Sequence, residues 1–169
     1  MTESTTLPLR NQVSIDETWD LESVFASPAD WEAAGKELTK MITKLAAYQG
    51  KIKEGPKTLL AYLLLIDEAG TLAGKIRNYA SNYYSVDTTN QVNGARLGQT
   101  RSLLSDLGAA TAFFEPELMV IGLDVVDSWA RSTPDLGYFS HGLDKLRRKQ
   151  THVRSGEVEE VIAMTADSF

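Results

Sequence analysis

The sequence contains no cysteine among its 169 residues. Disulfides, thiolate nucleophiles, cysteine-ligated zinc and iron–sulfur clusters are therefore excluded. Only two histidines are present and no His-Glu-x-x-His motif occurs, so no single helix carries a pair of zinc-binding imidazoles. The sequence also lacks a phosphate-binding glycine loop, a dinucleotide fingerprint and a Gly-x-Ser-x-Gly nucleophile turn. The common routes to catalysis are thus missing from these residues.

Long apolar runs and an excess of positive charge are missing as well. The longest apolar run, residues 59–66, is far short of the roughly 20 residues that span a bilayer. The N-terminus has no basic stretch followed by an apolar one, which argues against a secretory signal. With 17 Lys+Arg against 23 Asp+Glu, the net charge of −6 disfavours a broad nucleic-acid surface. We therefore expect a cytoplasmic protein with neither nucleic acid nor membrane as a partner.

What the sequence does contain is helical periodicity. Hydrophobic residues make up 43% and charged residues 24%, which suits a globular core. After the candidate cap Ser27 and Pro28, apolar residues recur at helical spacing, and Gly50 is a natural stop. Further helices are predicted at 56–84, with a break at 69–72 caused by Gly70, at 91–114, ending before Pro116, and at 124–131, 139–149 and 156–164. The fold class is all-α, an antiparallel bundle of about six helices.

Residues 1–27 lack a helical period and are predicted to form an extended N-terminal arm with a helical turn near 20–24. Its apolar residues should pin it to the core: Trp19, Leu21, Val24 and Phe25. The domain organisation is then an arm, 1–27, followed by a helical domain, 28–169.

Two stripes of small residues suggest how the long helices meet. The stripe in 56–84 consists of Gly70, Gly74 and Ser81, and the one in 91–114 of Gly94, Gly98, Ser105, Ala109 and Ala112. Small side chains let helix backbones approach closely. We expect these helices to form an antiparallel hairpin with the two stripes in contact.

The candidate chemical groups are few. His141 and His152 lie on different predicted elements, and a metal site joining them to a carboxylate such as Asp144 is one alternative. The favoured interpretation is two partly exposed histidines. Ser140 beside His141 is interpreted as a cap or surface serine, because adjacent helical residues point about 100° apart. No catalytic or metal-binding residue is predicted, and no substrate-binding residue is assigned.

Two surface features remain. A basic run, Lys145–Lys149 with Arg154 nearby, is either an interaction patch or, as we favour, is neutralised by Glu157, Glu159 and Glu160. In the adjacent aromatic pairs, Tyr83-Tyr84 and Phe113-Phe114, both rings cannot point inward. One ring of each pair is expected to meet a partner or a cavity.

Two segments resemble a known family. These are Thr18-Trp-Asp-Leu through Trp31-Glu32, and residues 138–164 with Leu-Arg-Arg, His-Val, a serine cap and an acidic helix. Both are similar to oligoendopeptidase F-type zinc metallopeptidases, relatives of thimet oligopeptidase. Residues 79–90 and 114–118 fall in the family's order, so the resemblance spans about 7–169.

The resemblance implies a helical clamshell whose N-terminal lobe walls a channel for short peptides. Zinc would be held by a His-Glu-x-x-His helix and a further acidic ligand, none of which can be carried over to this sequence. We therefore expect the N-terminal lobe of a cytoplasmic zinc oligoendopeptidase, inactive alone, with no cofactor in this chain and zinc in the full-length enzyme. Its partners would be the catalytic domain and an oligopeptide substrate, and the isolated chain could form a homodimer. The alternatives are a freestanding helical scaffold that self-associates and a module binding an acidic ligand near Arg147.

Overall fold

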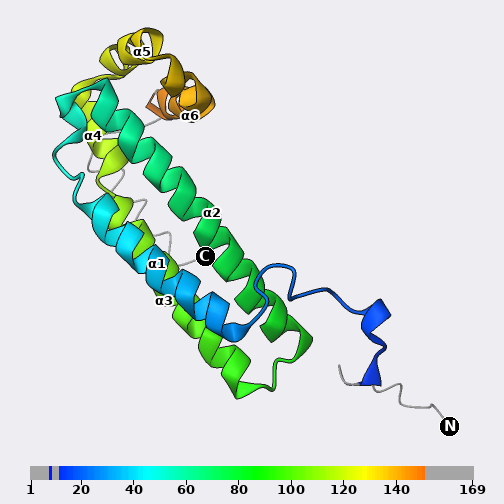
Figure 1. The fold of residues 1–169 in the computed structure, drawn as a ribbon. Coiled ribbons are helices and arrows are strands. Elements are labelled where there is room, and N and C mark those ends of the chain that lie inside the picture. The colour runs from blue at the N-terminus through cyan, green and yellow to red at the C-terminus, as the bar shows by residue number, and fades with distance from the viewer. Residues whose placement is uncertain (1–7, 9–11, 151–169) are drawn as a thin grey trace. The chain divides into compact units, whose positions relative to one another are not determined.

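The computed structural model describes residue 8 and residues 12–150, which form helices joined by turns and no strand (Figure 1). The all-α prediction is confirmed, and the number of helices is close to the expected six. The helices are α1 (Pro28–Ala46), α2 (Pro56–Val86), α3 (Gln91–Thr111), α4 (Phe114–Ile121), α5 (Leu123–Ser132) and α6 (Ser140–Gln150). Three 3₁₀ turns accompany them: η2 (Ile15–Glu17), η3 (Ile52–Glu54) and η4 (Pro134–Phe139). The helix predicted at 156–164 lies outside the described residues.

The chain divides into two compact units. The first unit comprises residues 1–49 and 64–112, and the second comprises 50–63 and 113–169. The first contains α1, α3 and most of α2, and the second contains the start of α2 and α4–α6. The boundary between an arm, 1–27, and a helical domain, 28–169, stays a prediction.

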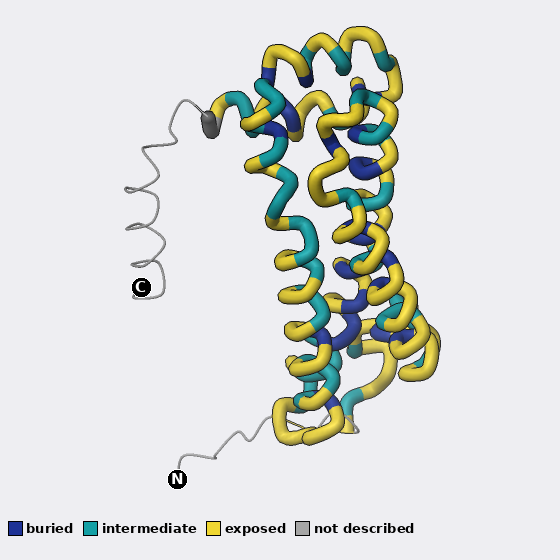
Figure 2. Tube along the Cα trace, turned by 90° about the vertical axis from the view of Figure 1, so that its left-hand side faces the viewer, coloured by how far each residue is buried: buried dark blue, intermediate teal, exposed yellow. Residues whose placement is uncertain are grey.

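Helix α1 begins and ends by local rules that are legible in the sequence. The Ser27 hydroxyl oxygen accepts a hydrogen bond from the Asp30 amide at 3.2 Å, and Pro28 occupies the first position, where no amide is needed. The helix ends at Ala46, and Gly50 takes a left-handed φ of +79° in the turn that follows. Its buried face packs on α3 within the first unit. This face consists of Trp31, Leu38, Met41 and Leu45, and Figure 2 shows how buried positions recur along each helix.

The predicted break in the second helix is wrong. Helix α2 continues through Gly70 for 31 residues. Gly70 is exposed, whereas Ala69, Ala73 and Ile76 beside it are buried. Burial of this neighbouring face offsets the roughly 1 kcal/mol that one glycine costs in a helix interior.

The predicted end of the third helix is also wrong. Helix α3 stops at Thr111, and a new helix, α4, starts at Phe114 with Pro116 in its first turn. The first amides of a helix have no intrahelical acceptor, so a proline there costs little. A residue taken as a terminator therefore lies at the start of a helix that the sequence did not reveal.

The predicted contact between the small-residue stripes is wrong too. Gly70 and Gly74 on α2 are exposed, as are Gly98, Ser105 and Ala109 on α3. Helix α3 packs against α1, and it contacts α2 through Arg96 and Asn93 rather than through these exposed small residues.

The start of the chain partly matches the expectation. Leu21 is buried and the Phe25 ring meets Tyr79 edge-on at 5.6 Å, but Trp19 is 79% exposed. Residues 20–24 form a hydrogen-bonded turn rather than helix, and the short helical turn lies earlier, at η2. Within the arm, Leu21 is therefore buried and Phe25 packs on Tyr79, whereas the expected burial of Trp19 is wrong.

The second unit is assembled from short elements. Its buried residues are Ile52, Leu59, Tyr62, Leu63, Leu118, Leu123, Val126, Leu136 and Leu143. Gly122 joins α4 to α5 with φ +92° and ψ 125°, a conformation that residues with a side chain rarely adopt. Its amide donates to the Leu118 carbonyl and its carbonyl accepts from the Val125 and Val126 amides. One residue thus ends one helix and starts the next.

Candidate functional site

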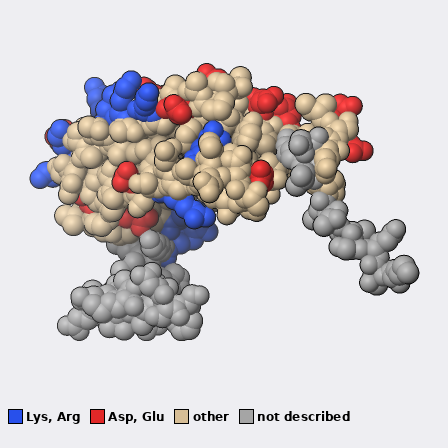
Figure 3. Space-filling view, turned by 90° about the horizontal axis from the view of Figure 1, so that it is seen from below, with Lys and Arg blue, Asp and Glu red and all other residues tan. Residues whose placement is uncertain are grey.

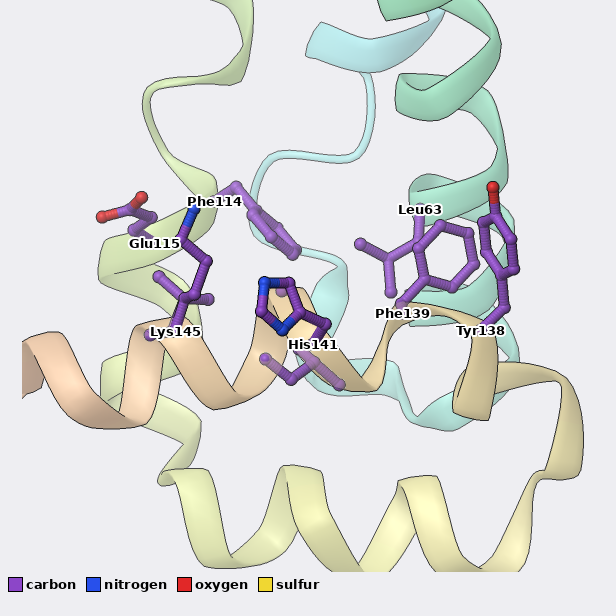
Figure 4. A pocket seen from close by; sticks show the side chains of 10 residues that line it. Leu63, Phe114, Glu115, Tyr138, Phe139, His141 and Lys145 are labelled. Carbon is purple, nitrogen blue, oxygen red and sulfur yellow. The ribbon is translucent and has the colours of Figure 1, made fainter.

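The second unit has an open hollow with a volume of about 690 Å³ (Figure 4). Its walls come from the start of α2, from α4, from η4 and from α6. Apolar side chains form most of the lining: Leu63, Phe114, Tyr138, Phe139, Leu143 and Leu146. The hollow therefore presents a surface suited to apolar groups.

Packing beneath the hollow fixes its walls. The Phe114 ring stacks on Tyr62, with centroids 4.5 Å apart, and Phe113 meets the same tyrosine edge-on at 5.7 Å. Leu136 of η4 is fully buried, and Leu143 anchors α6 at 7% exposure. The walls are thus held by the core even though the hollow itself is open.

Three polar residues line the hollow. His141 and Lys145 lie one turn apart on α6, and Glu115 comes from α4. In Figure 4 His141 and Lys145 rise from α6 toward the hollow, across from Phe114. An apolar floor beside a lysine can accommodate an apolar side chain next to an acidic group.

The two buried tyrosines, Tyr62 and Tyr79, do not act as proton acceptors at neutral pH. Burial, with a smaller contribution from the Glu117 charge, raises the pKa of Tyr62 to about 12. Burial also raises the pKa of Tyr79 to about 12, assisted by a hydrogen bond with Tyr83. Both phenols stay protonated, so they serve packing rather than general-base chemistry.

The residues considered for chemistry are not assembled into a catalytic group. His141 is exposed, as expected, whereas His152 lies outside the described residues. Asp144 pairs with Arg148 at 3.2 Å, and Ser140 begins α6. Among the residues that the structure describes, no group of three histidines, aspartates or glutamates is placed to hold a metal.

The basic run is divided among different neighbours. Arg147 pairs with Asp127 and, at 3.2 Å, with Asp124, both on α5. Arg148 pairs within α6, and Lys145 lines the hollow. The neutralising acids found here differ from those proposed at 157–160, which lie outside the described residues. Figure 3 likewise shows acidic and basic side chains on one face, divided by uncharged surface.

The adjacent aromatic residues find partners within their own units. Tyr83 packs on Tyr79 with centroids 4.6 Å apart, and Tyr84 lies 3.9 Å from the position of a Cβ at Gly94. Phe113 and Phe114 both contact Tyr62. Of these four rings, Phe114 lines a cavity, as the pattern suggested for one member of its pair.

The sequence did not single out Arg96, which organises the first unit. Its guanidinium lies 5.5 Å from the Trp31 ring centroid and 5.8 Å from those of Tyr79 and Tyr83. Asn93, one turn earlier, accepts a hydrogen bond from Arg96 at 3.1 Å. The three rings come from α1 and α2, so the periodicity of α3 alone could not reveal them.

Comparison with known proteins gives consistent matches. A family model described as Oligopeptidase F matches residues 117–169. Oligopeptidase PepF of Bacillus subtilis is 26% identical over 161 residues, covering 95% of this chain and 24% of that protein. Group B oligopeptidase PepB of Streptococcus agalactiae is 26% identical, and the oligoendopeptidase F homolog of Lactococcus lactis 25%; each alignment covers 95% of this chain and 27% of the relative. No solved structure matches the chain significantly.

These matches confirm the resemblance drawn from the sequence. The chain spans about a quarter of the length of the curated relatives that it matches. The family-model match lies within the second unit and begins in α4. No described helix is both long and apolar enough to cross a membrane.

Proposed function

Because this chain is similar to oligopeptidase F relatives over 95% of its length, we propose that it is the N-terminal helical lobe of a zinc-dependent oligoendopeptidase. The enzyme would act on short peptides in the cytoplasm. In this proposal the chain forms one wall of a substrate channel and supplies no catalytic group. Its partners are the catalytic domain of the same enzyme and the oligopeptide in the channel.

The described residues do not fit a zinc site. Asp124 and Asp127 both pair with Arg147, and Asp144 pairs with Arg148. No three potential ligands converge in the part of the chain described here. The zinc of the proposed enzyme would therefore be held by residues outside those described here, and no reaction step is assigned to the described residues.

The contribution of the chain would be steric. Its helices are rigid rods, and the 31 residues of α2 extend for about 46 Å. A wall of such rods limits access by size, because a folded substrate cannot enter a channel that an extended peptide can. Similarity to proteins named oligopeptidases supports this role.

The decisive experiment starts from the gene. We expect the reading frame to continue past Phe169 into a His-Glu-x-x-His segment. The full-length protein should cleave fluorogenic peptides of short length and leave a folded protein intact, whereas residues 1–169 alone should cleave neither. A Glu→Gln change within that motif is the matched inactive control. A frame that ends without the motif, or peptide cleavage by the isolated chain, would contradict the proposal.

A freestanding scaffold that self-associates is the second candidate. It is favoured by large apolar side chains left exposed, of which Val120 is 88% and Tyr138 76% exposed. Such surface promotes pairing between copies. Light scattering after size-exclusion chromatography would then give a dimer mass that Val120→Asp or Tyr138→Asp reduces to a monomer. A monomer at all concentrations would remove this candidate.

A further inference from the structure

The first unit has an open groove of about 490 Å³ between α1 and α3, which pack side by side (Figure 1). Trp31 and Leu103 provide apolar surface in it, and Gly35 contributes only backbone. The Gln99 amide and the Ser102 hydroxyl also line it, and both groups can donate and accept hydrogen bonds. Such a groove suits an extended peptide, because a peptide backbone needs hydrogen-bond partners when it leaves water.

Arg96 lies next to the Trp31 end of this groove. On α3, residues 96, 99, 103 and 106 recur at helical spacing and so share one face, and the last three of them line the groove. The Arg96 guanidinium lies 5.5 Å from the ring centroid of Trp31, which lines the groove as well. One end of the groove is therefore next to a cation.

The Arg96 guanidinium is held in a fixed orientation. The rings of Trp31, Tyr79 and Tyr83 lie at 5.5–5.8 Å from it. One N–H donates to the Asn93 side-chain oxygen at 3.1 Å, and the buried Asn93 in turn donates to the Tyr83 carbonyl. The half-buried Arg96 side chain thus loses little conformational freedom when it binds a further group.

This cation has donors to spare. A guanidinium carries five N–H groups, of which the bond to Asn93 uses one. None of the ion pairs found between described residues involves Arg96. A carboxylate is the planar anion that matches the fork of a guanidinium through two parallel hydrogen bonds. Arg96 is therefore suited to bind a carboxylate at the end of the groove.

The far end of the groove carries the opposite charge. Asp106 lines it and is exposed, whereas Glu32 and Lys36, one turn apart on α1, contribute charges that cancel. From Arg96 to Asp106 the helix rises about 15 Å, which is about the length of four to five residues of extended chain. A peptide of about five residues carries its terminal carboxylate and its terminal ammonium at this separation. The charges at the two ends of the groove are thus complementary to those of a short peptide.

We propose that the groove between α1 and α3 binds an extended peptide of about five residues, with its C-terminal carboxylate on Arg96 and its amino end at Asp106. The inference rests on the function proposed above in one respect, the choice of an oligopeptide as the ligand. It adds the place where the peptide lies and the direction in which it runs. Arg96 binds and orients the peptide, and no bond is made or broken there.

Peptide binding to the 169-residue chain tests this inference without any need for catalysis. The probe is penta-alanine with both ends free, and NMR follows the Arg96 Nε–H signal, which is identified by its loss in Arg96→Lys. Penta-alanine should shift this signal saturably. Amidation of its C-terminus should weaken binding at least about tenfold, because the charge-assisted hydrogen bonds are lost. Equal affinities for the free acid and the amide would overturn the proposal.

Three further probes exclude other sources of binding. Acetate should bind at least about tenfold more weakly than penta-alanine, since it makes no contact along the groove; equal affinity would overturn the proposal. Tetra-alanyl-glutamate amide carries its carboxylate on a side chain and should bind like the amide. If it binds as well as the free acid, the assignment of the C-terminus fails. N-acetylation of penta-alanine should cost about threefold, as for an exposed ion pair, and no loss would overturn the assigned direction.

Variants of the chain provide matched controls. Arg96→Lys keeps the charge but lacks the fork, so it should reduce the preference for the free acid over the amide at least about threefold. Arg101→Lys, on the exposed side of the same helix, should leave the preference unchanged. Asp106→Asn should match the loss caused by N-acetylation and add nothing to it. Far-UV circular dichroism checks that each variant is folded. An undiminished preference in Arg96→Lys would overturn the proposal.

The outcome is separable from that of the peptidase proposal. If the full-length protein cleaves peptides but the 169-residue chain shows no preference for a free C-terminus, the proposed function stands and the inference fails. If the reading frame lacks the His-Glu-x-x-His motif but the chain binds the free acid selectively, the inference stands and the proposed function fails.

Discussion

The two units differ in the side chains that hold their cores together. The first unit closes around Arg96, which contacts three aromatic rings, and Trp31 donates a hydrogen bond to the Ile76 carbonyl at 3.2 Å. The second unit packs Tyr62 between two phenylalanines but leaves an apolar hollow open. The first unit is therefore organised around one cation, and the described part of the second around one tyrosine.

Polar pairing shows the same contrast. In the first unit the buried Asn93 donates to the Tyr83 carbonyl at 3.1 Å, and the buried Thr100 donates to the Arg96 carbonyl at 2.9 Å. Both polar groups are satisfied inside the unit. In the second unit the strongest polar cluster, Arg147 with Asp124 and Asp127, is on the surface of α5 and α6.

The largest expected effect contrasts two aromatic residues. Trp31→Ala should lower the free energy of unfolding by about 3–5 kcal/mol, since it leaves a cavity and removes an indole hydrogen bond. Phe114→Ala should cost clearly less, because Phe114 is only half-buried whereas Trp31 is 7% exposed. Urea denaturation followed by circular dichroism measures both, and Trp31→Phe separates the hydrogen bond from the packing. Equal losses would break the contrast between the units.

The next largest effect is expected for Arg96 of the first unit. Arg96→Ala should lower the free energy of unfolding by about 2 kcal/mol, because one partly desolvated guanidinium contacts three rings. Arg96→Lys should recover only part of this, since an ammonium lacks the planar fork. Arg101→Ala on the exposed side of the same helix is the control and should change stability by less than about 0.5 kcal/mol. Thermal unfolding measures both losses. Equal losses of stability for Arg96→Ala and Arg101→Ala would refute the role assigned to Arg96.

A smaller effect is expected for the ionic cluster of the second unit. Arg147→Ala should cost about 1 kcal/mol in low salt and less in high salt, because Asp124 is fully exposed and Asp127 and Arg147 are both partly exposed. Arg148→Ala removes a more exposed pair on the same helix and should cost about 0.3 kcal/mol. Urea titrations at two ionic strengths compare the variants. A salt-independent cost for Arg147 would indicate packing rather than charge.

The smallest effect concerns the turn between α2 and α3. The Thr89 hydroxyl and, to a smaller extent, its backbone amide donate hydrogen bonds to the Asp87 carboxylate. These bonds hold the pKa of Asp87 below its ordinary 3.8. A carboxyl group whose pKa is lower in the folded state stabilises the fold at pH values above its unfolded-state pKa. This stabilisation is lost as the pH falls through the folded-state pKa. The small advantage of the wild type over Asp87→Asn should therefore be present at neutral pH and disappear in acid below about pH 3.8. Melting temperatures of both proteins across this range would show it; a constant difference would contradict it.

Capping residues and apolar periodicity predicted those helices whose ends depend only on neighbouring residues. Ser27, Pro28 and the apolar stripe of α1 define that helix without help from distant residues. The error at Gly70 arose because a propensity cost was weighed without the burial of its neighbours. The error at Pro116 arose because the same residue can end one helix or start another, and only the packing of Phe113 and Phe114 on Tyr62 decides which.

The hollow could not be predicted for a different reason. Leu63, Phe114 and Tyr138 are far apart in the sequence and carry no shared spacing. The same holds for the rings around Arg96. The sequence did indicate that His141 is exposed and that an aromatic pair would border a cavity. The sequence thus indicated the surroundings of individual residues, but it did not indicate which distant residues meet at the hollow or around Arg96.

The junction at Gly122 has a consequence for how the second unit can vary. Because a single residue is shared by the caps of α4 and α5, no slack exists there to absorb an insertion or a deletion. Any change of length would rotate one rod about the other and displace the buried Leu118 or Leu123. The angle between α4 and α5 therefore depends on the backbone conformation of this one glycine.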